Sequence, residues 1–171
     1  MDEIDFPFCP KCGSLVIKSS THSACPTCRS DFYFNPRSCN AIIITNERQE
    51  ILLTKRKHNP AAGRWDLPGG FVNLGETAEE SVKREAKEEL GVDLVNIMYL
   101  CSGADRYMYK GVNYHTLGLI FVAKIMDTQI PIPNDDVTEV KYFERSSIDL
   151  DQLAFPSLRT VLEYYWSHET K

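Results

Sequence analysis

Three glutamates that follow a glycine-rich stretch are the strongest candidates for chemistry in this sequence. Glu85, Glu88 and Glu89 are spaced so that a helix would carry their carboxylates on one face. Like charges at such spacings repel one another by roughly a few tenths of a kcal/mol per pair. Hard oxygen ligands suit Mg²⁺ or Mn²⁺, which also take water and phosphate oxygens. The pattern therefore favours a divalent-metal site over the solvated acidic face that such runs usually form.

The residues around these glutamates predict the helix that would position them. Thr77 is a favourable N-cap, and Glu80, three residues later, would complete a capping box. Gly91 is suited to end the helix in a left-handed conformation. The apolar residues between them recur at the helical period and would form one buried stripe: Ala78, Val82, Ala86 and Leu90. A glycine-rich loop, residues 68–75, leads into this helix.

The segment from Gly70 to Val92 resembles the Nudix box at every fixed position of that motif. The matching residues are Gly70, Glu76, Arg84, Glu85, Glu88, Glu89, Gly91 and the aliphatic Val92. Nudix enzymes hydrolyse the pyrophosphate bond of a nucleoside diphosphate linked to another moiety. The resemblance implies an α/β fold, an α/β/α sandwich around a mixed sheet, and a reaction that depends on Mg²⁺ or Mn²⁺.

The resemblance also implies roles for individual residues. The expected magnesium ligands are Glu85, Glu88, Glu89 and the carbonyl oxygen of Gly69. Glu89 is the first choice for the base that deprotonates water, and Arg84 would hold Glu88 and Glu76 in place. The base can lie elsewhere in this family, and the distal candidates are Asp135, Asp136 and Glu139.

Three residues outside the box are candidates for substrate binding. Arg56 belongs to a basic run at the end of a predicted strand, and its guanidinium suits a phosphate. Arg64 lies at the entry to the glycine-rich loop. Tyr107 belongs to a polar segment, residues 103–113, that we expect to be a loop whose aromatic side chains sandwich a base.

Four cysteines near the N-terminus predict a second metal site. Cys9 and Cys12 form one Cys-x-x-Cys pair, and Cys25 and Cys28 form another. Two such pairs are typical of a tetrahedral zinc site, and a segment this small would draw its folding free energy from the metal. A pair of disulfides is the alternative. Residues 1–37 carry four acidic and four basic side chains, so we expect a structural or dimerising role rather than nucleic-acid binding.

The chain divides into two expected units, a zinc ribbon at residues 1–35 and a larger domain at residues 36–171. Pro36 favours an extended link between them. In the larger domain, alternating or continuous apolar runs predict strands at residues 41–44 and 51–53, flanking a turn, and at 94–101, 114–125 and 139–143. Residues 157–166 have a helical period and a further helix is expected there.

Composition and motifs together define the expected function. The net charge of −5 argues against general binding to nucleic acid or anionic membranes, and no apolar run is long enough to span a bilayer, so we expect a cytoplasmic protein. The ribbon ahead of the box resembles the Nudix subgroup that includes NADH and FAD pyrophosphatases. ADP-ribose, FAD or an NAD(H)-like dinucleotide is the favoured substrate, although the Ser-Gln-Pro-Trp array typical of NADH pyrophosphatases is missing after Val92. The alternatives are a non-standard nucleoside triphosphate as substrate and a non-enzymatic nucleotide sensor.

Overall fold

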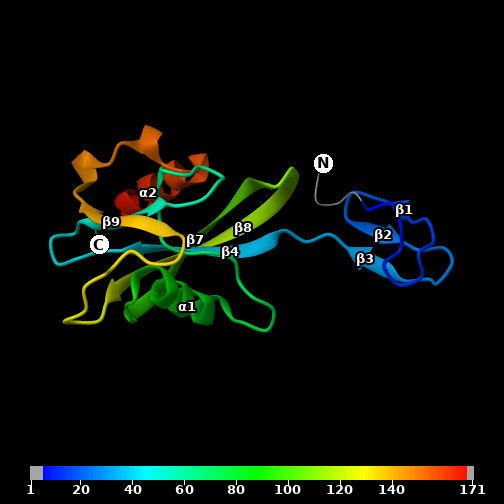
Figure 1. Cartoon of the computed structure of the whole chain (residues 1–171), viewed down its shortest axis with the longest axis horizontal. Coiled ribbons are helices and arrows are strands. Elements are labelled where there is room, and N and C mark those ends of the chain that lie inside the picture. The colour runs from blue at the N-terminus through cyan, green and yellow to red at the C-terminus, as the bar shows by residue number, and fades with distance from the viewer. Residues whose placement is uncertain (1–5, 169–171) are drawn as a thin grey trace.

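The protein was analysed as a computed structural model, which describes residues 6–168. Its N-terminal part is a small three-stranded antiparallel sheet, drawn in blue at one end of Figure 1. The strands are β1 (Ile17–Lys18), β2 (His22–Ala24) and β3 (Asp31–Tyr33). Just before β1, Leu15 forms an isolated bridge with Phe8. A short extended segment joins this sheet to the larger body (Figure 1).

The larger body contains a mixed sheet, as predicted. Its strands are β4 (Arg37–Ile44), β8 (Val112–Ile125) and β7 (Leu94–Tyr109), in that order. β4 pairs with β8 in parallel, and β7 pairs with β8 antiparallel. A parallel pair needs a crossover connection, and the chain between β4 and β8 supplies it.

A second sheet, entirely antiparallel, lies beside the first. Its order is β6 (Trp65–Asp66), β5 (Ile51–Arg56) and β9 (Val137–Phe143). The strands expected on either side of the turn at residues 46–49 thus lie in different sheets and meet only at one bridge, Thr45 to Ile51. The turn is present, and the Oδ1 atom of Asn46 accepts hydrogen bonds from the backbone N–H groups of Arg48 and Glu50.

The expected loop at residues 103–113 was a wrong prediction, because this segment is the end of a long hairpin. β7 continues to Tyr109, β8 begins at Val112, and Asp105 pairs with Thr116. Only Lys110 and Gly111 form the turn, with φ values of 47° and 80°. Positive φ at both central residues gives a two-residue turn whose twist matches that of the strands. The ladder therefore extends through residues whose polarity suggested a loop.

Two helices cover opposite faces of these strands. α1 (Ala78–Leu90) has the predicted capping box at Thr77 and ends at Gly91, whose φ is 71°. α2 (Pro156–His168) contains the predicted helix at residues 157–166. Two short 3₁₀ helices, η1 (Arg145–Ser147) and η2 (Leu150–Gln152), precede α2. Within residues 6–168, no helix has the length and apolar character required to cross a bilayer.

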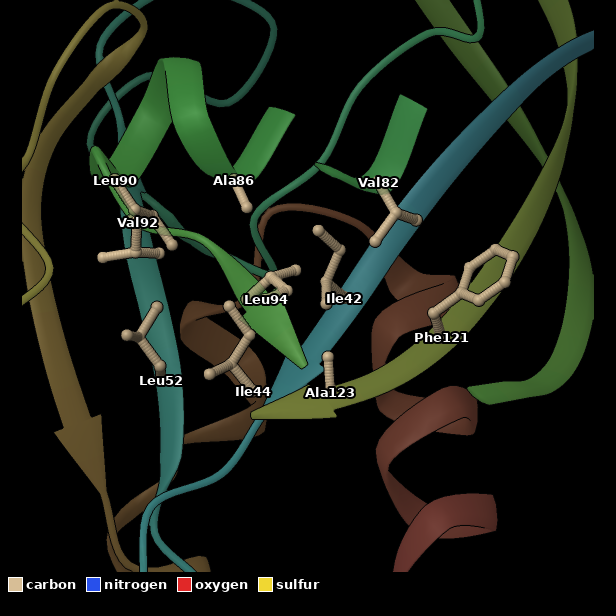
Figure 2. Close-up of a cluster of buried hydrophobic side chains, with 10 residues drawn as sticks. All are labelled: Ile42, Ile44, Leu52, Val82, Ala86, Leu90, Val92, Leu94, Phe121 and Ala123. Atoms are coloured by element: carbon tan, nitrogen blue, oxygen red, sulfur yellow. The ribbon is translucent and has the colours of Figure 1, made fainter. Parts of the chain in front are cut away.

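The alternation of side chains along β4 builds a core on each face. Ile42 and Ile44 point toward α1, where they pack with its apolar stripe (Figure 2). Ile43 lies in the other cluster, with Leu162 of α2. A strand whose both faces are buried is apolar at successive positions. The result is the expected α/β/α arrangement, with α1 held firmly against β4.

Candidate active site

A cavity of about 700 Å³ opens between the start of α2, the hairpin β7–β8 and the carboxylate face of α1. Its lining includes the expected metal-site residues: Gly69, Arg84, Glu85, Glu88 and Glu89. Arg56 and Tyr107 also line it, whereas Arg64 does not. The structure thus brings together residues from several strands, both helices and their connecting loops around one space.

The glycine-rich loop forms one edge of this cavity by pairing with β4. The carbonyls of Pro68 and Gly70 accept the backbone N–H groups of Ile42 and Asn40, at 2.9 and 2.8 Å. Gly69 has a φ of 143°, and a Cβ atom there would lie 2.3 Å from the carbonyl oxygen of Asn40. A Cβ atom on Gly70 would lie 2.5 Å from a carboxylate oxygen of Glu85. Gly69 is therefore needed for the loop to lie against the backbone of β4, whereas a side chain at Gly70 would displace the carboxylate of Glu85.

Arg84 is the centre of the charged network on α1. Its Nε donates to Glu76 at 2.8 Å, and its Nη1 donates to both Glu85 and Glu88, at 2.7 and 2.9 Å. Its Nη2 donates to the carbonyl of Phe71 at 3.0 Å. Glu76 and Glu88 are the two partners that sequence reasoning assigned to Arg84, and Glu85 is a third.

These contacts change the acidity of the groups involved. Hydrogen bonds from Arg84 lower the pKa of Glu76 to about 2, and the same bond raises the pKa of Arg84. Burial raises the pKa of Glu85, although Arg84 opposes the shift. Glu88 makes the most exposed contact of the three, with 49% of its side chain accessible. Arg84 therefore stabilises the ionised form of Glu76, whereas burial disfavours the ionised form of Glu85.

Among the described residues Glu89 has no hydrogen bond from Arg84, and its carboxylate contacts the glycine-rich loop. The backbone N–H of Gly69 donates to its carboxylate at 3.0 Å. Burial raises the pKa of Glu89 to about 8, and the nearby charge of Glu85 adds to the shift. The distal segment is close as well, because the N–H of Asn134 donates to the Glu89 carbonyl at 2.9 Å.

The donor set of this region fits a hard divalent cation. The side chains that could bind a metal do so through carboxylate oxygens. Among the described residues the carbonyl of Gly69 accepts no hydrogen bond, so its oxygen is available as a further ligand. Throughout residues 6–168, only the four cysteines have ligand atoms all within 4.8 Å of one another, so the glutamates are not a closed cage. Mg²⁺ uses one or two carboxylates together with water and substrate phosphates rather than an all-protein cage. The open arrangement is consistent with that mode of binding.

The cavity lining also includes an arginine and aromatic rings. Arg56 donates to Asp66 and to the carbonyl of Pro60, each at 2.8 Å. Its guanidinium lies 5.1 Å from the ring centre of Phe155. Tyr107 contacts Phe155 with ring centres 6.0 Å apart. Burial raises the pKa of Asp66 to about 6, and Arg56 opposes that shift.

The remaining candidates separate into two groups. Asp135 and Asp136 line the cavity, and Lys57 donates to the carbonyl of Asp135 at 2.9 Å. Glu139 does not line it and instead forms an ion pair with Lys55 at 2.6 Å. Arg64 donates to the carbonyl of Asp151, outside the cavity.

Sequence reasoning missed three residues that the structure places at the cavity. Asp66 is the buried partner of Arg56, and Phe155, just before α2, carries the ring beneath that arginine. Asn40 lies under the glycine-rich loop. Asp66 stands close to Gly69 in the sequence, which was a usable signal. No local pattern marks Asn40 or Phe155, because their neighbours come from distant segments.

The four cysteines form a compact cluster at the N-terminal sheet. The sulfurs of Cys9 and Cys28 lie 3.6 Å apart, and those of Cys12 and Cys25 lie 3.5 Å apart. A tetrahedral zinc site with Zn–S bonds of about 2.3 Å places its sulfurs about 3.8 Å apart. No disulfide joins the cysteines. The hydrogen bond with Ser30 lowers the pKa of Cys28 to about 6, which favours the thiolate that a metal needs.

Comparison with known proteins identifies the family. The model of the NUDIX domain matches residues 35–165. The chain belongs to the Nudix family. An ADP-ribose pyrophosphatase from Methanocaldococcus jannaschii is 34% identical to this Nudix chain over 123 residues, covering 71% of the chain and 69% of the relative. The predicted family is thereby confirmed.

A second relative shares the same region. The NAD-capped RNA hydrolase NudC of Haemophilus influenzae is 30% identical over 139 residues, which cover 80% of this chain. The match spans 50% of that relative, so this chain accounts for about half of its length.

The fold is also found among solved structures. A NUDIX hydrolase from Nitrosomonas europaea superimposes with a TM-score of 0.73 at 27% identity, covering 97% of this chain and 94% of that structure. The predicted fold class is confirmed by this match and by the mixed sheet between two helices.

Proposed function

We propose that this Nudix protein hydrolyses the pyrophosphate bond of a nucleoside diphosphate linked to another moiety, with ADP-ribose as the representative substrate. The observation that carries the proposal is one cavity lined both by carboxylates and by an arginine with aromatic rings. A substrate of this class combines a charged diphosphate, which suits carboxylates with bound metal, and a base, which suits aromatic rings. The ADP-ribose pyrophosphatase of M. jannaschii supports the choice of substrate.

The glutamates and Gly69 are the proposed ligands for magnesium. When bound, divalent ions neutralise a diphosphate and lower the pKa of water. Glu85, Glu88 and Glu89 supply the carboxylates, and the free carbonyl of Gly69 is available beside them. Arg84 acts as a positioning residue here, because its hydrogen bonds fix Glu85 and Glu88 relative to each other.

Glu89 is the proposed base. It faces the glycine-rich loop and is held by the N–H of Gly69, so its carboxylate is fixed without a bond from Arg84. A carboxylate in this position can accept the proton of an attacking water, which general base catalysis requires within hydrogen-bond reach. Asp136 lines the same cavity and is the distal alternative.

The arginine and the aromatic rings of the cavity would bind the nucleoside and one phosphate. Arg56 is fixed through its Nε and Nη1 atoms, and Nη2 has no hydrogen-bond partner within the described part of the chain. Nη2 can therefore donate to a phosphate oxygen or a ribose hydroxyl. Phe155 and Tyr107 offer ring faces for a base, since aromatic rings stack on one another in offset arrangements. Arg64 has no part in this proposal.

Substrate hydrolysis tests this assignment directly. Purified protein with Mg²⁺ should release phosphomonoester from ADP-ribose when it is assayed beside FAD, NADH, diadenosine polyphosphates and deoxynucleoside triphosphates. Glu88→Gln and Glu89→Gln should each lower kcat by roughly 100-fold or more, because they remove a metal ligand or a base.

Glu79→Gln is the matched control for those two variants. It makes the same chemical change on the exposed side of α1, away from the cavity, and should retain wild-type activity. Turnover that survives both substitutions would show that the site is assigned wrongly. Absence of turnover on every compound would favour a non-enzymatic nucleotide sensor. Turnover of triphosphates alone would favour a nucleoside triphosphate as the substrate.

The N-terminal sheet is the proposed zinc ribbon, a separate unit that ends near residue 35. Its two cysteine turns repeat one hydrogen-bond pattern: the N–H of Gly13 donates to the Cys9 carbonyl, and the N–H of Arg29 donates to the Cys25 carbonyl. Such paired turns can direct four thiolates at one ion. Cys9, Cys12, Cys25 and Cys28 are the proposed ligands.

A further inference from the structure

A polar pair lies buried between β4 and α1, directly beneath the proposed metal site. Asn40 is 5% exposed and Ser81 is 0% exposed. The amide Nδ2 of Asn40 donates to the hydroxyl of Ser81 at 2.6 Å. The neighbouring positions on the same two elements, Ile42 and Val82, are fully buried apolar residues in one cluster (Figure 2). Two apolar side chains would pack in this interface as well, since exchanging both partners of a buried hydrogen bond can be nearly neutral for stability.

The hydroxyl of Ser81 is also bonded to the charged network. Nη2 of Arg84 donates to it at 3.1 Å. A serine hydroxyl can accept two hydrogen bonds, and here it accepts one from β4 and one from Arg84. The same guanidinium donates to Glu85 and Glu88. Asn40 and Ser81 therefore link the strand to the arginine that holds two of the proposed metal ligands.

Asn40 is bonded to the glycine-rich loop as well. Its backbone N–H donates to the carbonyl of Gly70 at 2.8 Å, and its carbonyl lies so close to Gly69 that a Cβ atom there would be 2.3 Å away. Its Oδ1 atom is buried and has no partner among the described residues, so the bond to Ser81 alone fixes the amide. One residue thus contacts both halves of the proposed metal site, the loop and the helix.

We propose that Asn40 and Ser81 are a positioning pair that fixes Arg84, and with it Glu85 and Glu88, relative to the carbonyl of Gly69. The inference rests on the proposed function, because it concerns the metal site of that reaction. Asn40 lines the cavity, whereas Ser81 does not. The proposed role of both is to hold other residues in place. Their effect is to set the spacing between ligands that come from two different segments, and partners of this kind change metal affinity when they are removed.

Metal binding by the whole protein tests the proposal without relying on activity. Ser81→Ala should weaken Mn²⁺ affinity, measured by calorimetry and by the electron paramagnetic resonance signal of free Mn²⁺, by roughly 10-fold. Its kcat should fall while KM for the nucleotide stays within about twofold, because the variant leaves Arg56, Phe155 and Tyr107, the proposed nucleoside-binding residues, unchanged. Urea unfolding of each variant in EDTA reports stability separately.

The double variant Asn40→Val with Ser81→Ala separates positioning from stability. It removes both polar partners, so its urea midpoint should recover toward that of the wild type while Mn²⁺ affinity stays weak. Val82→Ala is the matched control, a truncation at the adjacent buried position on α1 that should lower the urea midpoint and leave Mn²⁺ affinity unchanged.

Two outcomes would overturn the proposal. Recovery of both stability and Mn²⁺ affinity in the double variant would mean that the pair has only a structural role. An equal loss of Mn²⁺ affinity in Val82→Ala would mean that any loosening of α1 weakens the site. Failure of the proposed function is distinguishable, because a wild-type protein that binds Mn²⁺ but hydrolyses nothing would leave this comparison intact.

Discussion

At the scale of single residues, one guanidinium organises the acidic face of α1. Arg84 donates to three carboxylates and one backbone carbonyl, which uses the fork geometry that distinguishes arginine from lysine. Glu85 and Glu88 would otherwise repel each other across one turn of the helix. Their shared bond to Nη1 offsets that repulsion in the protein without metal. A lysine at this position would offer one charged atom and could not make all these bonds at once.

The ion pair with Glu76 predicts a specific dependence of stability on pH. The pKa of Glu76 in the folded protein is about 2, below its ordinary value of 4.5. A lowered folded pKa stabilises the protein above the unfolded pKa, and that stabilisation is lost as pH falls from about 4.5 toward 2. Glu76→Gln should therefore lower the urea midpoint at pH 6 and have a much smaller effect at pH 2.5. Urea unfolding in EDTA at the two pH values measures both differences.

Glu79→Gln serves as the control for that measurement. Glu79 lies on the same helix but lines no part of the cavity, and Arg84 makes no hydrogen bond to it within residues 6–168. Its substitution should change the urea midpoint little at either pH. A destabilisation by Glu76→Gln that is as large at pH 2.5 as at pH 6 would contradict the lowered pKa.

At the scale of elements, α1 carries two functions on adjoining faces. Its apolar stripe packs on Ile42 and Ile44 of β4, and its carboxylates face the cavity. The helix must therefore keep one rotation and one register against β4. Its capped ends fix where it begins and stops, and the buried stripe fixes which face turns inward. Both features are needed for the glutamates, which are correctly spaced in the sequence, to face the cavity together.

The capping box makes a measurable contribution to α1. The hydroxyl of Thr77 accepts the N–H of Glu80 at 3.2 Å, and the carboxylate of Glu80 accepts the N–H of Thr77 at 2.8 Å. Thr77→Ala should lower the free energy of unfolding by about 1 kcal/mol, because it leaves an N–H at the helix start without a partner. Thr77→Ser keeps the acceptor and should stay near the wild type in urea unfolding. Equal values for the two variants would show that the cap does not stabilise this helix.

At the scale of the whole molecule, the N-terminal sheet and the larger body differ in how much apolar surface they bury. The larger body has two apolar clusters on either side of its strands. The N-terminal sheet has strands of two or three residues, and Leu15, Ile17 and Tyr33 are exposed on it. A unit with so little buried apolar surface depends on a metal or a covalent link for its stability. The cysteine cluster is the feature that can supply it.

Removal of zinc should therefore unfold the ribbon and spare the body. Purified protein should contain one tightly bound zinc per chain, and its removal by a chelator should expose residues before Pro36 to limited proteolysis. Both tryptophans, Trp65 and Trp166, lie in the body, so their fluorescence should report an unchanged unfolding transition.

Two cysteine variants make that test specific. Cys12→Ser should lose the zinc, because it removes one ligand of the cluster, whereas Cys101→Ser should keep it, since Cys101 lies on β7. Zinc that remains in Cys12→Ser, or is absent from the wild type by elemental analysis, would contradict the proposed ribbon.

The sequence alone determined the parts that depend on local spacing. The run from Gly70 to Val92 contains its own loop, cap, apolar stripe and stop signal, so the helix and its acidic face followed from neighbouring residues. The cysteine cluster was equally local, because each pair shares one turn. Hydrogen bonds within a few residues and the helical period do not require knowledge of the rest of the fold.

Only the tertiary structure decided which distant side chains meet at the cavity. It extended the hairpin through Tyr107, placed Arg64 outside, and brought Phe155 beneath Arg56. It also placed Asn40 of β4 against Ser81 of α1. These contacts depend on strand pairing and helix packing between segments far apart in the chain. The sequence around a polar strand residue does not reveal its hydrogen-bond partner, because that partner is set only when the elements pack together.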